Sequence, residues 1–474
     1  MKKLSIAFLI LTVLLMAVPA LTMPFFANAA NTEKRQLSEA PVLIQEDGSL
    51  NPHFSVDMNT WIQEHIGFRG EMIAVNSRLR TSLFGQGATD DIVVGKEGWL
   101  FYHESVNDFL HVPTITPRNA ANAARTAALF QAWTEEAGSR FLLAFLPNKN
   151  TVYGEYMPYY YRPRQGEGNR ELFLQALSKE GVSYADVLPA LKNAEGQLYQ
   201  KQDSHWTYEG ALVGYRALME AAALPYDAFE GMSFTPVKNW PADLAVYLYG
   251  EGAQPDVQAY PDYTFTFGYR SRTTAVDSLT LETYQPEGRG SVVVYRDSFL
   301  NTMQAYLAQS FEKALFSRAI PYQAELVKRQ KADLTILQLT ERSLGDYVFR
   351  APQMAAPEVN LEGEARRISP ERVSLAQEKT GNLLHFFGVI DESLLGETYR
   401  VYLMMGKPDQ ARAFEAFPIY EKELLGMAEG AAKGLDNGWS LYLPAELLEG
   451  ETELGLCIES AGARYLAPLR GGEN

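Results

Sequence analysis

The amino-acid sequence predicts an α/β protein: a doubly wound parallel sheet with helices on both faces, followed by a small C-terminal β-sandwich. Three observations predict this fold. Apolar strand-like runs alternate with helical patterns through the middle of the chain, as they do in βαβ units. Several of these runs are continuously apolar, which is typical of strands buried on both faces. Beyond about residue 352, short alternating runs separated by Gly, Asp, Asn and Glu indicate antiparallel strands instead.

The start of the chain carries a targeting signal. Lys2 and Lys3 precede the apolar run LSIAFLILTVLLMAVPALTMPFF, and Ala27-Asn28-Ala29 then offers an A-x-A cleavage site. Because the run approaches the length that spans a bilayer, residues 1–30 are either a cleaved signal peptide or a retained N-terminal anchor. Both readings place the rest of the chain outside the cytoplasm, either secreted or anchored to the cytoplasmic membrane.

Residues 31–90 are expected to form a tether followed by helices. Residues 31–51 are polar and interrupted by proline, whereas apolar residues recur at helical spacing from Phe54 to Phe84. Gly67 is predicted to divide this pattern into two helices. The next segment, DDIVVGKEGWLFYHES, holds two short apolar strands around a Lys-Glu-Gly turn and predicts a hairpin.

Residues 91–350 are expected to form the α/β domain. Its predicted strands are apolar runs, and its predicted helices carry apolar residues at helical spacing. The strands are FLLAFLP (141–147), VSYADV, SVVVY (291–295) and LTILQL, and the helices are 120–137, 170–180, one that begins near Tyr208, and one that follows the turn after Tyr295 and includes KALF.

Residues 352–474 are expected to form the β-sandwich, with strands in HFFGVI, TYRVYLMM, GWSLYLP and ELGLCIES. Cys457, the single cysteine of the chain, lies in an alternating run and is predicted to be buried. A single cysteine permits no intramolecular disulfide. If this unit binds glycan, Trp439 and Tyr442 are candidates for a stacking platform, although alternation predicts that at least one of them faces inward.

Composition and charge exclude several classes of function. The chain has 474 residues, of which 46% are hydrophobic, so it can bury sizeable cores. Its formal net charge of −16 argues against nucleic acid as a partner, because phosphate binding needs a basic surface. No Cys pair or H-x-x-x-H spacing points to zinc, and no glycine-rich phosphate loop points to a nucleotide. Neither a metal nor another cofactor is therefore expected.

A serine follows the strand SVVVY at the point where a helix is predicted to begin. A hydroxyl in this position stands at the carboxyl edge of the sheet, where α/β proteins form their ligand sites. A helix N-terminus also supplies free N–H groups for a developing oxyanion. Ser298 is therefore a candidate nucleophile, but serine is also a favoured helix N-cap, and taken alone the cap is the more common role.

The segment KQDSHWTY places a histidine two residues after an aspartate. In an extended segment the two side chains point the same way, so Asp203 can hold the Nδ1–H of His205. The Nε2 atom is then able to take a proton from a serine. The alternative is that Asp203 or Ser204 caps the helix that begins near Tyr208.

Together these motifs resemble the DHHW family, relatives of the AlgJ and AlgX alginate O-acetylation proteins in the SGNH-hydrolase-like superfamily. The resemblance covers about residues 31–350 and rests on NTWIQEHIGFRGEMI, KEGWLFY, LPNKNTVYGEYMP, DSHW, PADLAVYLYG and YRDSF in this order. It implies that Asp203 orients His205, that His205 is the general base and that Ser298 is the nucleophile. The chain departs from the family name at Ser204, which replaces the first His.

Other polar groups near the predicted strand ends are candidates for substrate binding. Lys149 follows FLLAFLP and is either a ligand for a substrate hydroxyl or carboxylate or a solvated loop residue. Trp206 is either core or a wall of the pocket, and Arg296 stands where SGNH proteins have Gly. Glu341 and Arg342 follow LTILQL and are expected to pair with each other or with neighbours.

The resemblance implies an exported serine-dependent O-acetyltransferase or acetylesterase that acts on a cell-surface or secreted polysaccharide. Ser298 would take up the acetyl group and pass it to a sugar hydroxyl or to water, and a membrane-bound O-acyltransferase is the expected acetyl donor. The alternative is a noncatalytic polysaccharide-binding or scaffold protein of an exopolysaccharide assembly, in which the β-sandwich binds glycan. The presence of Ser298 together with Asp203 and His205 favours the enzyme.

Overall fold

A seven-stranded sheet forms the centre of the computed structural model, which describes residues 2–26, 38–45, 47–406, 411–421, 435–448 and 453–469. The predicted cleavage site at residues 27–29 lies outside the described residues. The sheet has the order β4-β3-β11-β9-β10-β8-β7, in which the first five strands are parallel and the last two add an antiparallel edge. The strands are β3 (Arg140–Leu146), β4 (Tyr184–Asp186), β7 (Gly268–Tyr269), β8 (Thr280–Tyr284), β9 (Ser291–Tyr295), β10 (Lys313–Ser317) and β11 (Leu334–Thr340).

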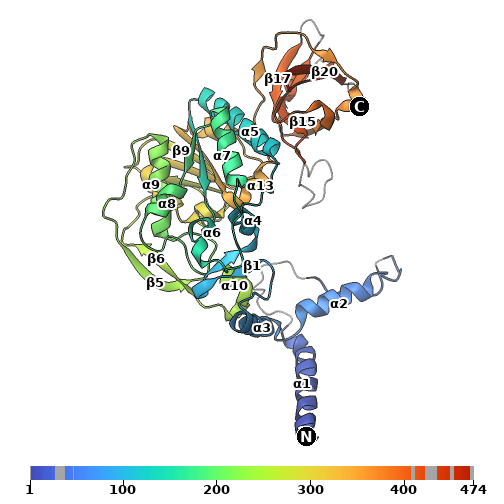
Figure 1. Cartoon of the computed structure of the whole chain (residues 1–474), viewed down its shortest axis with the longest axis vertical. Coiled ribbons are helices and arrows are strands. Elements are labelled where there is room, and N and C mark those ends of the chain that lie inside the picture. Colours follow the sequence, from blue (N-terminus) through green and yellow to red (C-terminus); the bar gives the residue numbers. More distant parts are fainter. Residues whose placement is uncertain are drawn as a thin grey trace.

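Helices cover both faces of this sheet, which confirms the predicted α/β fold (Figure 1). Side chains of β3 alternate between two cores, because successive residues of a strand point to opposite faces. Leu142 and Ala144 pack in the core beneath α9, and Phe141 and Leu143 pack in the core beneath α5. The covering helices are α5 (Pro117–Glu136), α7 (Asn169–Glu180) and α12 (Glu325–Gln330) on one face, and α8 (Leu188–Asn193), α9 (Tyr208–Ala222) and α11 (Gln304–Ser310) on the other.

One predicted element of the α/β domain is wrong. The sequence predicts a single helix after Tyr295 that includes KALF, but α11 ends at Ser310 and Lys313–Ser317 form β10. This strand pairs with β9 on one side and with β8 on the other. A short apolar run fits a strand and a helix equally well, and here the backbone pairing on both sides decides for the strand.

The N-terminal segment contains three helices and the predicted hairpin. The helices are α1 (Lys2–Phe26), α2 (Phe54–His65) and α3 (Arg69–Phe84), so the predicted break at Gly67 is confirmed. Within the described residues, α1 is the one helix long and apolar enough to cross a membrane, over Leu4–Met23. The hairpin of β1 (Ile92–Val94) and β2 (Leu100–Tyr102) then leads into the α/β domain.

The C-terminal segment is a small β-sandwich, as predicted. A six-stranded sheet and a three-stranded sheet enclose one apolar core, with strands in all four predicted runs. Cys457 is buried, and both Trp439 and Tyr442 are also buried, so neither presents a ring to solvent. The sheets are β12-β17-β16-β19-β20-β13 (Glu358–Val359, Arg412–Ala416, Tyr399–Met405, Leu454–Ser460, Ala463–Leu469, Arg366–Arg367) and β14-β15-β18 (Ala376–Thr380, Leu383–Val389, Gly438–Pro444).

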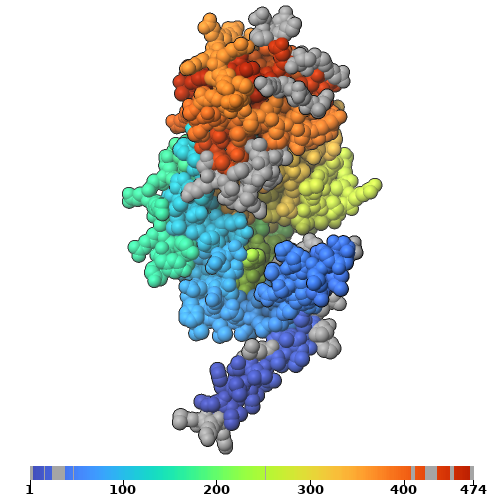
Figure 2. Space-filling model, turned by 90° about the vertical axis from the view of Figure 1, so that its right-hand side faces the viewer, coloured from blue at the N-terminus to red at the C-terminus, as the bar shows by residue number. Residues whose placement is uncertain are grey.

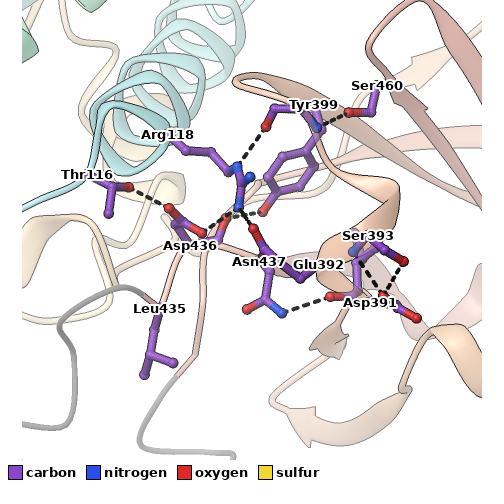
Figure 3. Close-up of polar contacts among 12 residues, drawn as sticks. Thr116, Arg118, Asp391, Glu392, Ser393, Tyr399, Leu435, Asp436, Asn437 and Ser460 are labelled. Carbon is purple, nitrogen blue, oxygen red and sulfur yellow. Dashed lines mark hydrogen bonds and ion pairs between the residues drawn. The ribbon is translucent and has the colours of Figure 1, made fainter.

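The sandwich is fixed to the α/β domain at the first turn of α5. Arg118 donates hydrogen bonds to Asp436, at 2.7 Å, and to Glu392, at 2.6 Å (Figure 3). The hydroxyl of Thr116, the N-cap of α5, donates to the other oxygen of Asp436 at 2.5 Å. The cap and the arginine therefore connect the two units, and Figure 2 shows the sandwich at one end of the molecule and α1 at the other.

Candidate active site

Ser298 lies directly after the central strand β9, at the carboxyl edge of the sheet. It is the first residue of a short 3₁₀ helix, Ser298–Asn301, and its side chain is half-buried. The alternative that Ser298 is the helix N-cap is wrong, because Asp297 is the cap. The carboxylate of Asp297 accepts the backbone N–H of Phe299 at 2.7 Å and the hydroxyl of Thr340 at 2.7 Å. The serine hydroxyl is thereby left for other contacts.

Asp203 and His205 meet across a tight bend. The Oδ1 atom of Asp203 accepts the Nδ1–H of His205 at 2.7 Å and also the backbone N–H of His205 at 2.9 Å. The second bond closes an Asx-type turn, in which an aspartate binds the backbone two residues on. The two side chains were expected to face each other from an extended segment. The structure brings them together through this bend instead.

The imidazole of His205 reaches Ser298 with its other nitrogen. Its Nε2 atom lies 3.1 Å from the Oγ atom of Ser298, although the two residues are 93 positions apart. The His205 side chain is 21% exposed and that of Asp203 is 4% exposed. A hydroxyl, an imidazole and a buried carboxylate therefore form one hydrogen-bonded chain that opens to solvent at the serine end.

The carboxylate of Asp203 stays charged although it is buried. Burial raises its pKa, but the hydrogen bond and charge of His205 and the backbone N–H groups that it accepts lower the pKa to about 2. Its Oδ2 atom accepts the indole N–H of Trp240 and the backbone N–H of Asp243, both at 3.0 Å. With four donors on two oxygens, the carboxylate is held in one orientation and in turn fixes the ring of His205.

A second carboxylate lies beside the same imidazole. The Oδ2 atom of Asp243, in the first turn of α10 (Asp243–Tyr249), lies 3.5 Å from the Nδ1 atom of His205. The hydroxyl of Ser204 donates to the same oxygen at 2.5 Å and lies 3.2 Å from Nδ1. Burial disfavours the charged imidazole, but the hydrogen bond and charge of Asp203 and the charge of Asp243 raise the pKa of His205.

Neither Asp203 nor Ser204 caps the next helix. Helix α9 begins at Tyr208, as predicted, and its cap is Thr207, whose hydroxyl accepts the backbone N–H of Gly210 at 3.1 Å. The capping alternative is therefore wrong. The side chains of Asp203 and Ser204 are free to organise His205.

The structure places Lys149 beneath the site rather than in it. Its side chain is buried, and its ammonium donates to the backbone carbonyls of Gln200, Lys201 and Asp203 at 2.7–3.1 Å. Burial lowers the pKa of Lys149 to about 7, although the negative charge of Asp203 acts to raise it. The expected contact with substrate is therefore not available to this ammonium. Lys149 instead holds the loop that carries Asp203.

The two other predicted substrate ligands are also buried. Trp206 is 0% exposed and packs against the ring of Phe299, with 4.8 Å between centroids, so the core reading of this residue is the one that the structure supports. Arg296 is 4% exposed and donates to Asn301, at 2.5 Å, and to the carbonyl of Val276. Burial lowers the pKa of Arg296 to about 10. Arg296 thus stabilises the turn after β9 from within the protein interior.

Arg342 was expected only to pair with Glu341 or with neighbours, but its charge acts on the candidate site. It follows β11, and its guanidinium carbon lies 5.6 Å from the ring centroid of Phe299, the residue next to Ser298. Its positive charge opposes protonation of His205. Glu341 bonds to neighbours as expected, and its carboxylate accepts the backbone N–H of Asn148 at 2.9 Å, whereas the guanidinium of Arg342 lies over the rings of Tyr102 and Phe299.

Among the described residues, Asp203, His205 and Asp243 are the one group whose ligand atoms lie close enough to hold a metal ion, within 4.8 Å of one another. The oxygens of both carboxylates already accept hydrogen bonds, from Nδ1, from the Ser204 hydroxyl and from backbone N–H groups. This pattern suits an oriented imidazole with a hydrogen on Nδ1. The chemistry that it can perform is proton transfer between Nε2 and the hydroxyl of Ser298.

Comparisons with known proteins bear out the resemblance found in the sequence. Residues 92–287 match the family model described as "SGNH hydrolase-like domain, acetyltransferase AlgX". A probable alginate O-acetylase AlgJ of Pseudomonas putida is 29% identical over 146 residues, and the one of Pseudomonas syringae pv. tomato is 30% identical over 146 residues. Each match spans 30% of this chain and about a third of the relative, 36% and 35% respectively.

Several solved structures are similar as well. The O-acetyltransferase domain of Pseudomonas putida AlgJ has a TM-score of 0.35, with 19% identity over 53% of this chain and 91% of that one. Bacillus cereus PatB1 has a TM-score of 0.44 with 17% identity over 54% of this chain and 97% of that one. A DHHW family protein from Eubacterium siraeum has a TM-score of 0.38 with 15% identity over 47% and 85%.

Proposed function

We propose that this chain, which is similar to AlgX and AlgJ proteins over part of its length, is an extracytoplasmic polysaccharide O-acetyltransferase that uses Ser298 as its nucleophile. One observation carries the proposal: the hydrogen-bonded chain from Asp203 through His205 to Ser298 at the carboxyl edge of the sheet. Serine is a weak nucleophile at its own pKa and needs a base within hydrogen-bond reach, which in turn needs an orienting group.

In the first half-reaction, Ser298 attacks the carbonyl carbon of an acetyl ester while the Nε2 atom of His205 takes the hydroxyl proton. The bond from the carbonyl to the donor oxygen then breaks, and the imidazolium returns the proton to that leaving oxygen. The products are the donor alcohol and an acetyl ester on Ser298. Asp203 keeps its charge throughout and stabilises the imidazolium, as its pKa of about 2 requires.

In the second half-reaction, a sugar hydroxyl takes the place of the donor alcohol. His205 removes its proton, the sugar oxygen attacks the acetyl ester, and the Ser298 oxygen leaves with the proton from His205. Water in place of the sugar gives hydrolysis, so an acetyltransferase must hold the sugar in position more effectively than water. Arg342, beside Phe299, is the candidate for holding charge or a sugar oxygen at this point.

The proposed setting follows from α1. An apolar helix over Leu4–Met23 supports export and, if it is retained, anchoring to the cytoplasmic membrane. The acceptor is then a cell-surface or secreted polysaccharide, and a membrane-bound O-acyltransferase is the proposed source of acetyl groups. The rival function, a noncatalytic glycan-binding scaffold, loses its proposed platform because Trp439 and Tyr442 are buried.

The proposal is tested with a chromogenic acetyl ester. Wild-type protein is expected to release the chromophore, and Ser298→Ala is expected to lose this activity almost entirely. Thr302→Ala is the matched control, since it removes a buried hydroxyl four residues further on and leaves Ser298 in place. Full esterase activity in Ser298→Ala would refute the assignment. Acetylated oligosaccharide among the products, when an acceptor is added, selects transfer over hydrolysis.

A further inference from the structure

Only one face of helix α3 is covered by the rest of the protein. Ala74 and Ser77 are buried, and the hydroxyl of Thr81 accepts from Tyr249 of α10 at 3.4 Å, so this face packs on the α/β domain. The opposite face is exposed. At about 100° per residue, its four apolar side chains fall within about 80° of one another on the helix. We call this set the α3 stripe: Met72 (41% exposed), Val75 (56%), Leu79 (54%) and Leu83 (69%).

Helix α2 adds a second apolar face that the protein covers only in part. None of its residues is buried, although Phe54, Met58 and Trp61 recur at helical spacing along one side. Trp61 stacks on His65 within the same helix, with 5.0 Å between centroids. An indole on a partly exposed apolar face is typical of the membrane interface, where its ring meets acyl chains and its N–H meets headgroups.

The junction between α2 and α3 touches the end of the apolar helix α1. The backbone N–H of Gly67 donates to the carbonyl of Pro19 at 3.0 Å, and a side chain at position 67 would collide with Thr22. Both contacts fall in the last turns of the segment Leu4–Met23, which is long enough to cross a bilayer. Figure 1 shows α2 and α3 at the end of α1 that lies away from the N-terminus. If α1 spans the bilayer, α3 therefore lies at the bilayer surface.

Charge on α3 fits the same surface. The chain as a whole has a net charge of −16, but α3 carries three arginines, Arg69, Arg78 and Arg80, and a single acid, Glu71. On the helix these arginines flank the α3 stripe on both sides. Arg69 and Arg78 also donate to the backbone carbonyls of Gln63, at 3.0 Å, and of Gly252, at 2.6 Å. Basic residues beside an apolar face are typical of helices that lie in the interface of an anionic bilayer, because their long side chains reach back to the headgroups.

We propose that α3 lies in the bilayer interface on the side of the α/β domain, with the α3 stripe buried among lipid acyl chains and α2 beside it. This inference rests on the proposed anchoring of the chain by α1. It adds an orientation to that anchor, because α3 packs on α10, and the backbone N–H of Asp243, the first residue of α10, donates to the carboxylate of Asp203 at 3.0 Å. The bilayer, α3, α10 and the proposed active site then follow one another in space. This order holds the site near the membrane that contains the proposed acetyl donor.

The inference is tested with the full chain reconstituted in vesicles of phosphatidylethanolamine and phosphatidylglycerol. A nitroxide label is attached in turn at Val75→Cys, at Leu79→Cys and at the control Lys379→Cys, which is exposed on the distant sandwich. Each is made in a Cys457→Ala background. Collision rates of the label with oxygen, which partitions into lipid, are compared with those of a water-soluble nickel complex. Alkaline extraction measures retention of the chain in the vesicles.

The expected result is a several-fold higher ratio of oxygen to nickel collisions at positions 75 and 79 than at position 379, with the chain retained after extraction. Retention combined with an aqueous ratio at all three positions would overturn the inference and leave the anchor standing. Immobilised labels that neither reagent reaches would overturn it in favour of a second copy of the chain. Loss of the chain on extraction overturns both the anchor and the inference. Hydrolysis of the chromogenic ester by the labelled variants reports separately on the proposed activity.

Discussion

The Nε2 atom of His205 lies 3.1 Å from the Oγ atom of Ser298, a contact that joins the loop before α9 to the turn after β9. Neither loop makes this contact alone. The bend at Asp203 aims the ring of His205, and the cap by Asp297 turns the chain after β9 so that the hydroxyl of Ser298 meets it. The predictions below test what each surrounding group contributes to this pair.

Replacing Asp203 with Asn is expected to lower kcat by about 10⁴-fold, the loss typical of such a change in a serine triad, because an amide favours the wrong tautomer of the imidazole. The measurement is steady-state hydrolysis of a chromogenic acetyl ester. Trp240→Phe is the control. It removes one of the four hydrogen bonds that the carboxylate of Asp203 accepts, and it should lower kcat far less. Equal losses in both variants would contradict the assigned role of Asp203.

Asp203 also makes the stability of the fold depend on pH. Its pKa in the folded protein, about 2, lies below the ordinary value of 3.8 for an aspartate, so the charged carboxylate stabilises the fold above pH 4. This contribution is lost as the pH falls from about 4 to about 2, and amounts to about 2 kcal/mol. Urea unfolding of wild type and Asp203→Asn between pH 5 and 2 measures it. The variant should show the smaller decline, and parallel curves would refute the linkage.

Asp243 and Arg342 are expected to shift the acid limb of the pH–rate profile in opposite directions. The negative charge of Asp243 raises the pKa of His205 and the positive charge of Arg342 opposes it. Since His205 must be neutral to act as a base, Asp243→Asn should move the acid limb of kcat/KM to lower pH and Arg342→Gln should move it to higher pH. Asp90→Asn and Arg350→Gln, which change charges that are not among those named as acting on His205, should leave it unchanged. Shifts of the same sign in the first two variants would contradict the account.

Arg342 is further expected to contribute to turnover itself. Arg342→Lys keeps the charge but not the planar guanidinium that lies over the ring of Phe299, and should lower kcat/KM for acetyl transfer about 10-fold or more. Its stability to urea should match that of wild type, because the side chain is only half-buried. A large loss of stability with unchanged kcat/KM would show that Arg342 is a packing residue only.

Lys149→Met is expected to destabilise the protein by about 2–4 kcal/mol, because three backbone carbonyls inside the loop lose their donor. The neighbouring Lys201→Met is the matched control, since Lys201 is only half-buried and its ammonium lies 6.0 Å from the ring of Trp99. Urea unfolding compares the two variants. Stability equal to wild type in Lys149→Met, with acetyl transfer abolished, would restore the reading of Lys149 as a substrate ligand.

Much of the fold is predictable from the sequence because its signals are local. The long apolar run of β3 and the alanine-rich pattern of α5 each specify their element, and Gly67 marks the break between α2 and α3. The strand β10 is missed because Lys313–Ser317 carry too short a pattern to separate strand from helix. Its pairing with β9 and β8 depends on residues far away in the chain.

The candidate site likewise contains residues that the sequence predicts and residues whose place the sequence does not predict. The sequence identifies three residues of the site because each lies beside a predicted helix start or strand end, where its side chain has few alternative chemical roles. These residues are Asp203, His205 and Ser298. Lys149 and Arg342 both follow parallel strands, and the sequence does not separate them. The loop 200–203 buries the first, whereas the second is half-exposed beside Phe299. Burial of this kind depends on which loop covers which strand end, and short-range patterns do not encode it.

The acyl-enzyme itself gives the most direct test of the central claim. Wild-type protein is mixed briefly with an acetyl ester, quenched in acid and digested, and the peptides are mapped by mass spectrometry. We predict one acetyl group on Ser298 in the wild type and none in Ser298→Ala. An unmodified Ser298 under conditions of rapid turnover, or undiminished turnover in Ser298→Ala, would contradict the account.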